Sequence, residues 1–153
     1  ADGRFLPSAA AVITRALRDL SIRPELSMCE DPQLYVHPDL ASYTDATGLP
    51  WFSLAAADRD DCRIDVQRLA VVVERSSLEL TLRHELFHLA PPAGWARWRA
   101  EGEALLFSGE EPRAAPLAGL QPGQLDALLL TPSDQETMLR AAATARAWVL
   151  QGR

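Results

Sequence analysis

The residues around position 80 combine a helical pattern with two prolines that must end it. Leucines recur at a helical spacing and form one apolar stripe: Leu78, Leu82, Leu86 and Leu89. Ser76 followed by Glu79 has the spacing of a capping box, which predicts a helix beginning near Ser77. Pro91-Pro92 cannot continue a helix, so we expect this one to end just after His88. The sequence therefore predicts a short helix that ends abruptly at the two prolines.

This helix carries two of the three histidines in the chain, in the pattern H-E-x-x-H. His84 and His88 are four residues apart, so a helix projects both from one face, where two imidazoles can bind one zinc ion. Glu85 lies at the edge of that face and can reach a water on the metal, which suits a general base. The motif is short, and an amphipathic helix with solvent-facing histidines is the alternative.

The following segment, Trp95–Leu106, strengthens the zinc interpretation. Its W-x-x-E-G-x-A, taken with H-E-L-F-H, resembles the gluzincin pattern of the peptidase MA-like clan. The resemblance implies that Glu101 is the third zinc ligand, on a second helix, leaving the fourth position for water. Glu103 is the rival ligand. Gly102 would let this helix pack close against the histidine helix, from which it returns through a tight turn after Pro91-Pro92.

Composition bounds the class of protein. A length of 153 residues fits a single domain, which we expect to span residues 1–153. The net charge of −6 argues against nucleic acid as a partner, and no apolar run is long enough for a membrane span. All fifteen basic residues are arginine, which excludes covalent chemistry based on lysine.

The two cysteines, Cys29 and Cys62, do not have the spacing of a zinc site. Both lie in segments expected to be extended, so a disulfide and two free thiols both remain open. The chain begins Ala-Asp-Gly, as a mature form does after signal removal, and we expect an exported protein, periplasmic or secreted.

Period-two patterns and breakers predict a small, mostly antiparallel sheet before the histidine helix. The expected strands are residues 26–29, 33–37, 49–56 and 62–67, the last two forming a hairpin. Its turn holds Asp58, Asp60 and Asp61, which lack the pattern of a calcium loop and are expected to be solvated. Helices are expected over residues 7–21, capped by Ser8, and from Pro38-Asp39 to Gly48.

After the glutamate helix we expect two more helices. One spans Gln124–Leu130, and the last runs from a cap at Thr131, with Pro132 and Asp134 in its first turn, to about Leu150. The expected fold class is therefore α+β and zincin-like, with a small sheet followed by the active-site helix, the glutamate helix and C-terminal helices.

The expected function is zinc-dependent hydrolysis of a peptide bond in a peptide or protein substrate, with Glu85 as the base. A second group should stabilise the oxyanion. The candidates are Tyr35, Tyr43, His37, Arg140 and Arg146. His37 could instead be a zinc ligand or a structural histidine. Two alternatives stay open: a zincin-like domain that binds zinc but acts as a binding or scaffold module, and a metal-free helical protein with a coincidental motif.

Overall fold

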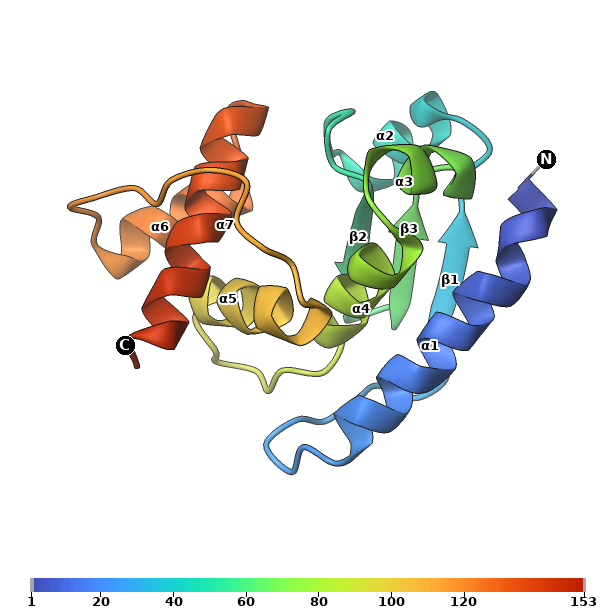
Figure 1. Ribbon diagram of the computed structural model, residues 1–153, viewed down its shortest axis with the longest axis horizontal. Helices are drawn as coiled ribbons and strands as arrows, with labels where there is room; N and C mark the ends of the chain where they lie inside the picture. Colours follow the sequence, from blue (N-terminus) through green and yellow to red (C-terminus); the bar gives the residue numbers. More distant parts are fainter. Residues whose placement is uncertain (1, 153) are drawn as a thin grey trace. The chain divides into compact units, whose positions relative to one another are not determined.

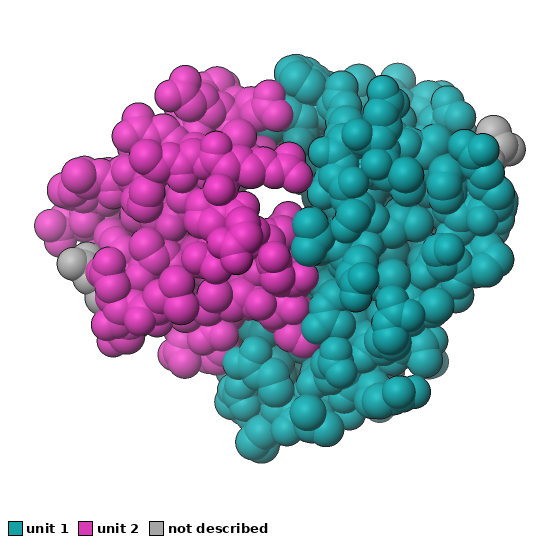
Figure 2. All heavy atoms as spheres, viewed as in Figure 1, with its two compact units in different colours: residues 1–92 teal, residues 93–153 magenta. Residues whose placement is uncertain are grey.

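A computed structural model describes residues 2–152 of the protein and divides the chain into two compact units (Figures 1 and 2). The first unit comprises residues 1–92 and the second residues 93–153. The fold class is α+β, because the described residues form seven α-helices and one three-stranded sheet. Among these residues, no helix is both long enough and apolar enough to cross a membrane.

The sheet belongs to the first unit and is mixed. Its strands are β1 (Gln33–Val36), β2 (Ala55–Asp58) and β3 (Arg63–Val66), in the order β1-β3-β2. β2 and β3 form the expected antiparallel hairpin, but β1 runs parallel to β3, so the expectation of a mostly antiparallel sheet is wrong for one of its two pairings. The central place goes to β3, whose Ile64 and Val66 are fully buried.

Two expected strands are absent or shortened. Residues 26–29 form no strand; their segment is held instead by a turn, with Leu26 N–H donating to Arg23, and by one bond from Ser27 N–H to the carbonyl of Ala90. The strand expected from residue 49 begins only at Ala55. Pro50 cannot donate to a ladder, and the chain turns there, with Ser53 N–H bonded to the carbonyl of Pro50.

The disulfide between Cys29 and Cys62 is present, with the two Cα atoms 5.8 Å apart. Cys29 lies shortly before β1 and Cys62 directly before β3, so the bridge joins the starts of the two parallel strands. The amide of Gln33 also donates to the carbonyl of Cys62. The covalent link therefore supports the pairing that local sequence patterns do not predict.

Four helices accompany the sheet: α1 (Leu6–Ser21), α2 (Leu40–Thr47), α3 (Leu69–Arg75) and α4 (Leu78–His88). A short 3-10 helix, Asp2–Phe5, precedes α1, so Ser8 is not its cap. α1 packs against α4, and α4 also packs against β2 (Figure 1). The α2 prediction is confirmed at both ends, by the Asp39 side chain that caps it and by Gly48 in the left-handed region behind it.

The second unit contains α5 (Arg97–Ser108), α6 (Pro122–Leu130) and α7 (Gln135–Leu150). Its buried cluster joins all three helices and consists of Trp98, Leu125, Ala141, Ala145 and Trp148. The last helix begins one turn later than expected, because the Asp134 carboxylate accepts from Thr137 N–H and replaces Thr131 as the cap. These three helices form a small core of their own.

Gly102 is packed closely, but not against the helix that we expected. A Cβ atom at this position would lie 2.5 Å from the carbonyl oxygen of Ala145 and 2.6 Å from Cγ2 of Val149, both on α7. The expectation that Gly102 faces the histidine helix is therefore wrong. The reason is that Gly102 is four residues after Trp98 and shares its face, which packs on Trp148 of α7 with ring centroids 5.4 Å apart.

Candidate functional site

The histidine pair lies on α4, whose ends agree with the sequence prediction. The helix ends at His88, as the two prolines require. At its start Ser77, rather than Ser76, is the cap: its hydroxyl accepts from Leu80 N–H at 3.0 Å. Leu78, Leu82 and Leu86 are buried, so the leucine stripe fixes the rotation of the helix and leaves the histidines half-buried on another face.

The two imidazoles point their Nε2 atoms at one another. These atoms are 3.0 Å apart, and the ring centroids are 4.8 Å apart. Two nitrogen ligands of one tetrahedral zinc, each at about 2.1 Å, would be about 3.4 Å apart. If the contact is a hydrogen bond, one imidazole must carry its proton on Nε2. If the pair binds a metal ion, both imidazoles carry their proton on Nδ1, and each Nε2 offers one lone pair to the ion.

Glu85 is half-buried directly after His84, and its charge acts on Tyr43 of α2. Burial raises the pKa of Tyr43 to about 12, and the negative charges of Glu85 and Asp65 add to the rise, while a hydrogen bond with Ser53 opposes it. The phenol is fully buried, with its oxygen 3.0 Å from Ser53 Oγ. Tyr43 therefore stays neutral and gives Glu85 a polar neighbour within the first unit.

His37 is a structural histidine in this arrangement. It is 3% exposed, with Nε2 2.8 Å from Asp65 Oδ1 and Nδ1 3.0 Å from Ser42 Oγ. Both ring nitrogens are thus engaged by side chains of the first unit. Asp65 also accepts from Nε of Arg63 at 2.9 Å, so the buried carboxylate has partners on both oxygens. His37 has no nitrogen left for zinc.

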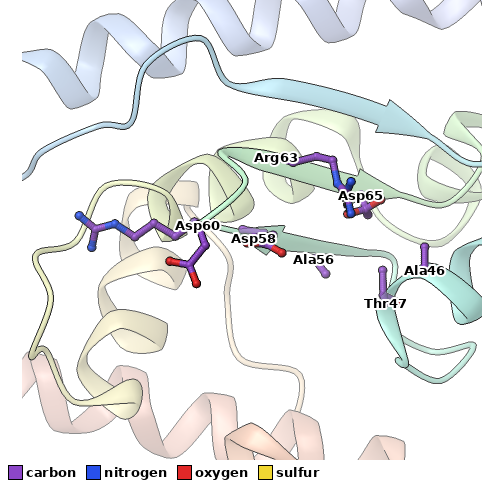
Figure 3. Close-up of a pocket in the computed structure, with 9 residues that line it drawn as sticks. Ala46, Thr47, Ala56, Asp58, Asp60, Arg63 and Asp65 are labelled. Atoms are coloured by element: carbon purple, nitrogen blue, oxygen red, sulfur yellow. Dashed lines mark hydrogen bonds and ion pairs between the residues drawn. The ribbon is translucent and has the colours of Figure 1, made fainter.

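A polar hollow of about 300 Å³ opens between α2 and the hairpin (Figure 3). Arg63 and Asp65 of β3 line it together with Asp58 and Asp60. Asp58 accepts from Asp61 N–H, which closes the turn. Asp58, Asp60 and Asp61 are all exposed, as expected for a solvated turn.

In the second unit, Glu101 and Glu103 are both half-buried on α5, on either side of the buried Gly102. Both arginines considered for the oxyanion are on α7 and have partners in this unit. Arg140 donates to the carbonyl of Ala115, and Arg146 pairs with Glu111 at 3.3 Å. The partner of Arg146 is 80% exposed, so this ion pair is a weak restraint on the arginine.

Burial separates the remaining oxyanion candidates. Tyr43 and His37 are inaccessible, and their polar atoms have intramolecular partners. Tyr35 is 54% exposed and stacks edge-on against His37 with ring centroids 4.7 Å apart. Direct contact with a substrate is therefore open to Tyr35 and to the α7 arginines, but not to the other two side chains.

No protein-family model matches this chain, and neither a curated protein nor a solved structure matches it.

Proposed function

We propose that the protein is a zinc-dependent hydrolase of the gluzincin type that cleaves peptide bonds. The observation that carries this proposal is the convergence of the Nε2 atoms of His84 and His88 at 3.0 Å on one capped helix. Imidazole nitrogens one helical turn apart are a preferred pair of ligands for zinc. Their fit to the ion is chemical as well as geometric, because both are neutral nitrogen donors.

The third ligand in this proposal is Glu101. Its support is the W-x-x-E-G-x-A sequence around it and the chemistry of the set, since two imidazoles and one carboxylate are a known donor set for a catalytic zinc ion. Two histidines and one carboxylate leave a fourth position for water, as a catalytic site requires. Zinc bound there supplies Lewis acidity, which polarises a carbonyl and lowers the pKa of bound water toward about 7.

Glu85 performs the proton transfers in this scheme. Its carboxylate takes a proton from the attacking water and returns it to the nitrogen of the leaving amine. Glu85 follows His84 directly, so it is held at the rim of the histidine face and not among the ligands. The negative charge of this carboxylate contributes to the raised pKa of the buried Tyr43 phenol. The oxyanion donor is then Tyr35, Arg140 or Arg146.

An extended peptide would add to the edge of the sheet at β2. In the order β1-β3-β2, the hydrogen-bonding edge of β2 opposite β3 has no partner strand among the described residues. β2 also packs against α4, which carries the histidines. Main-chain bonding along such an edge is a common way of holding a peptide extended. This geometry favours a peptide over a compact small molecule as the substrate.

We also propose that the protein is exported, to the periplasm or beyond the cell. The Cys29–Cys62 disulfide supports this location, because such bridges persist mainly in oxidising compartments.

Chelation and substitution together test the hydrolase proposal. The purified protein should contain one zinc per chain and cleave a quenched-fluorescence peptide library; a chelator should abolish cleavage and added zinc should restore it. Glu85→Gln should keep the zinc but reduce turnover by about two to four orders of magnitude. Zinc without turnover in either protein would favour the binding or scaffold module. Absence of zinc from the native protein would favour the third hypothesis, a metal-free helical protein with a coincidental motif.

A further inference from the structure

The packing of α5 on α7 suggests how the proposed glutamate ligand is selected. Gly102 is buried, and a Cβ there would meet the main chain of Ala145 at 2.5 Å and 2.8 Å. Main-chain atoms inside a helix cannot move aside as the end of a flexible side chain can. The two helices therefore approach at Gly102 to a distance that only glycine permits.

The same contact fixes the rotation of α5 about its own axis. Trp98 and Gly102 are one turn apart, and both face α7, where Trp98 stacks edge-on against Trp148. Along the rest of this interface α7 presents smaller side chains: Ala141 and Ala145 are fully buried, and Val149 lies against Gly102. On α5 a large side chain is followed one turn later by a glycine, and on α7 a large side chain is accompanied by smaller ones. Only one register of the two helices lets these surfaces pack without a gap or a clash.

Rotation decides which glutamate is presented on which flank. Successive residues of a helix are about 100° apart, so Glu101 and Glu103 lie about 100° to either side of Gly102. With Gly102 held against α7, the two carboxylates point to opposite flanks of α5. Only one of the two carboxylates can bind a metal ion that lies on one flank of α5. The other could replace it only if α5 rotated and Gly102 left its contact with α7.

We infer that α7 supports the metal site, and that Gly102 is a positioning residue that holds Glu101, rather than Glu103, toward the metal. This inference rests on the proposed function, because it assumes that Glu101 binds zinc. It assigns the C-terminal helix a role in metal affinity although no ligand lies on it. Supporting contacts of this kind commonly change metal affinity by about ten- to one hundredfold.

The first test compares two glycine-to-alanine variants. Gly102→Ala should lower zinc affinity about ten- to one hundredfold and alter the visible spectrum of the cobalt-substituted protein, because the carboxylate is displaced. Gly123→Ala is the matched control: this glycine is also helical and in the same unit, but a Cβ there meets nothing within 4 Å. Adding Val149→Ala to Gly102→Ala removes one of the two obstacles and should restore part of the affinity.

A second measurement needs no variant. Hydrogen exchange of the wild-type protein, with and without zinc, should show slower exchange of the α7 amides when zinc is bound. Unchanged α7 exchange, or a folded Gly102→Ala protein with wild-type zinc affinity and cobalt spectrum, would overturn the inference while leaving the zinc site intact. A wild-type protein that binds no zinc would instead overturn the proposed function, so the two failures are distinguishable.

Discussion

The Nε2 atom of His37 lies 2.8 Å from Oδ1 of Asp65, and this contact joins the chain after β1 to the middle of β3. The two residues are 28 positions apart in sequence and almost completely buried. Asp65 pairs with Tyr35 in the parallel register, so the contact closes the end of the pairing between β1 and β3. A histidine that we considered for the zinc site thus belongs to the sheet.

This assignment predicts a loss of stability without a loss of metal. His37→Ala leaves Asp65 buried with one partner removed, which should lower the free energy of unfolding by about 3 kcal/mol. Urea denaturation measures the change, and metal analysis should still find one zinc per chain. Tyr35→Phe, a change to the exposed neighbour, should shift stability little. A His37→Ala protein of normal stability but without zinc would contradict the structural role.

The zinc content of substituted proteins should distinguish the proposed ligands from neighbouring residues. His84→Ala, His88→Ala and Glu101→Ala should each lose zinc, because two remaining protein ligands hold the ion poorly. Glu103→Ala is the matched control and should retain it, since this carboxylate lies on the other flank of α5. Mass spectrometry of the metal in dialysed protein decides the matter. Retention by Glu101→Ala with loss by Glu103→Ala would reverse the assignment.

Local signals in the sequence predicted much of the helical structure. The caps at Asp39 and Gly48 and the prolines after His88 act within a few residues of themselves, so α2 and the end of α4 could be foreseen. The hairpin also followed from alternation across a polar turn. Ser76 and Ser77 are adjacent, and either could cap α4. The sequence did not distinguish them, because the identity of the cap depends on where the preceding helix α3 ends.

Contacts between distant residues were not predictable in the same way. The parallel pairing of β1 with β3 depends on which strand is buried most deeply and on the bridge between Cys29 and Cys62. The partner of Gly102 is a helix that begins more than thirty residues later. In the candidate site, the histidine spacing is local and was read directly, whereas the engagement of His37 by Asp65 required the tertiary fold.

The disulfide should contribute measurably to the stability of the first unit. Its cysteines are 33 residues apart, and closing a loop of this length stabilises a fold by about 3.7 kcal/mol in the chain-entropy model. The Cys29→Ser/Cys62→Ser double variant should unfold at correspondingly lower urea concentration. Thiol titration of the denatured, unreduced wild-type protein should find no free thiol from this pair. Two titratable thiols in protein prepared under oxidising conditions would contradict the bridge.

The buried phenol of Tyr43 should make the protein sensitive to alkali. Its pKa is raised to about 12 in the folded protein, chiefly by burial, whereas in the unfolded chain it is near the ordinary value of 10.0. Because the folded state favours the neutral phenol, this stabilisation is complete below about pH 10. It declines between about pH 10 and 12, where the unfolded chain has already lost the proton, and is absent above that range. The total loss is about 2–3 kcal/mol, from the size of the shift.

Urea titrations at several pH values between 9 and 11.5 measure this decline. Tyr43→Phe removes the ionisable group, so its stability should fall less steeply over the same window, although it starts lower because the hydrogen bond between Tyr43 and Ser53 is lost. An equal slope in the wild-type protein and Tyr43→Phe would show that the phenol ionises as readily in the folded protein as in the unfolded chain.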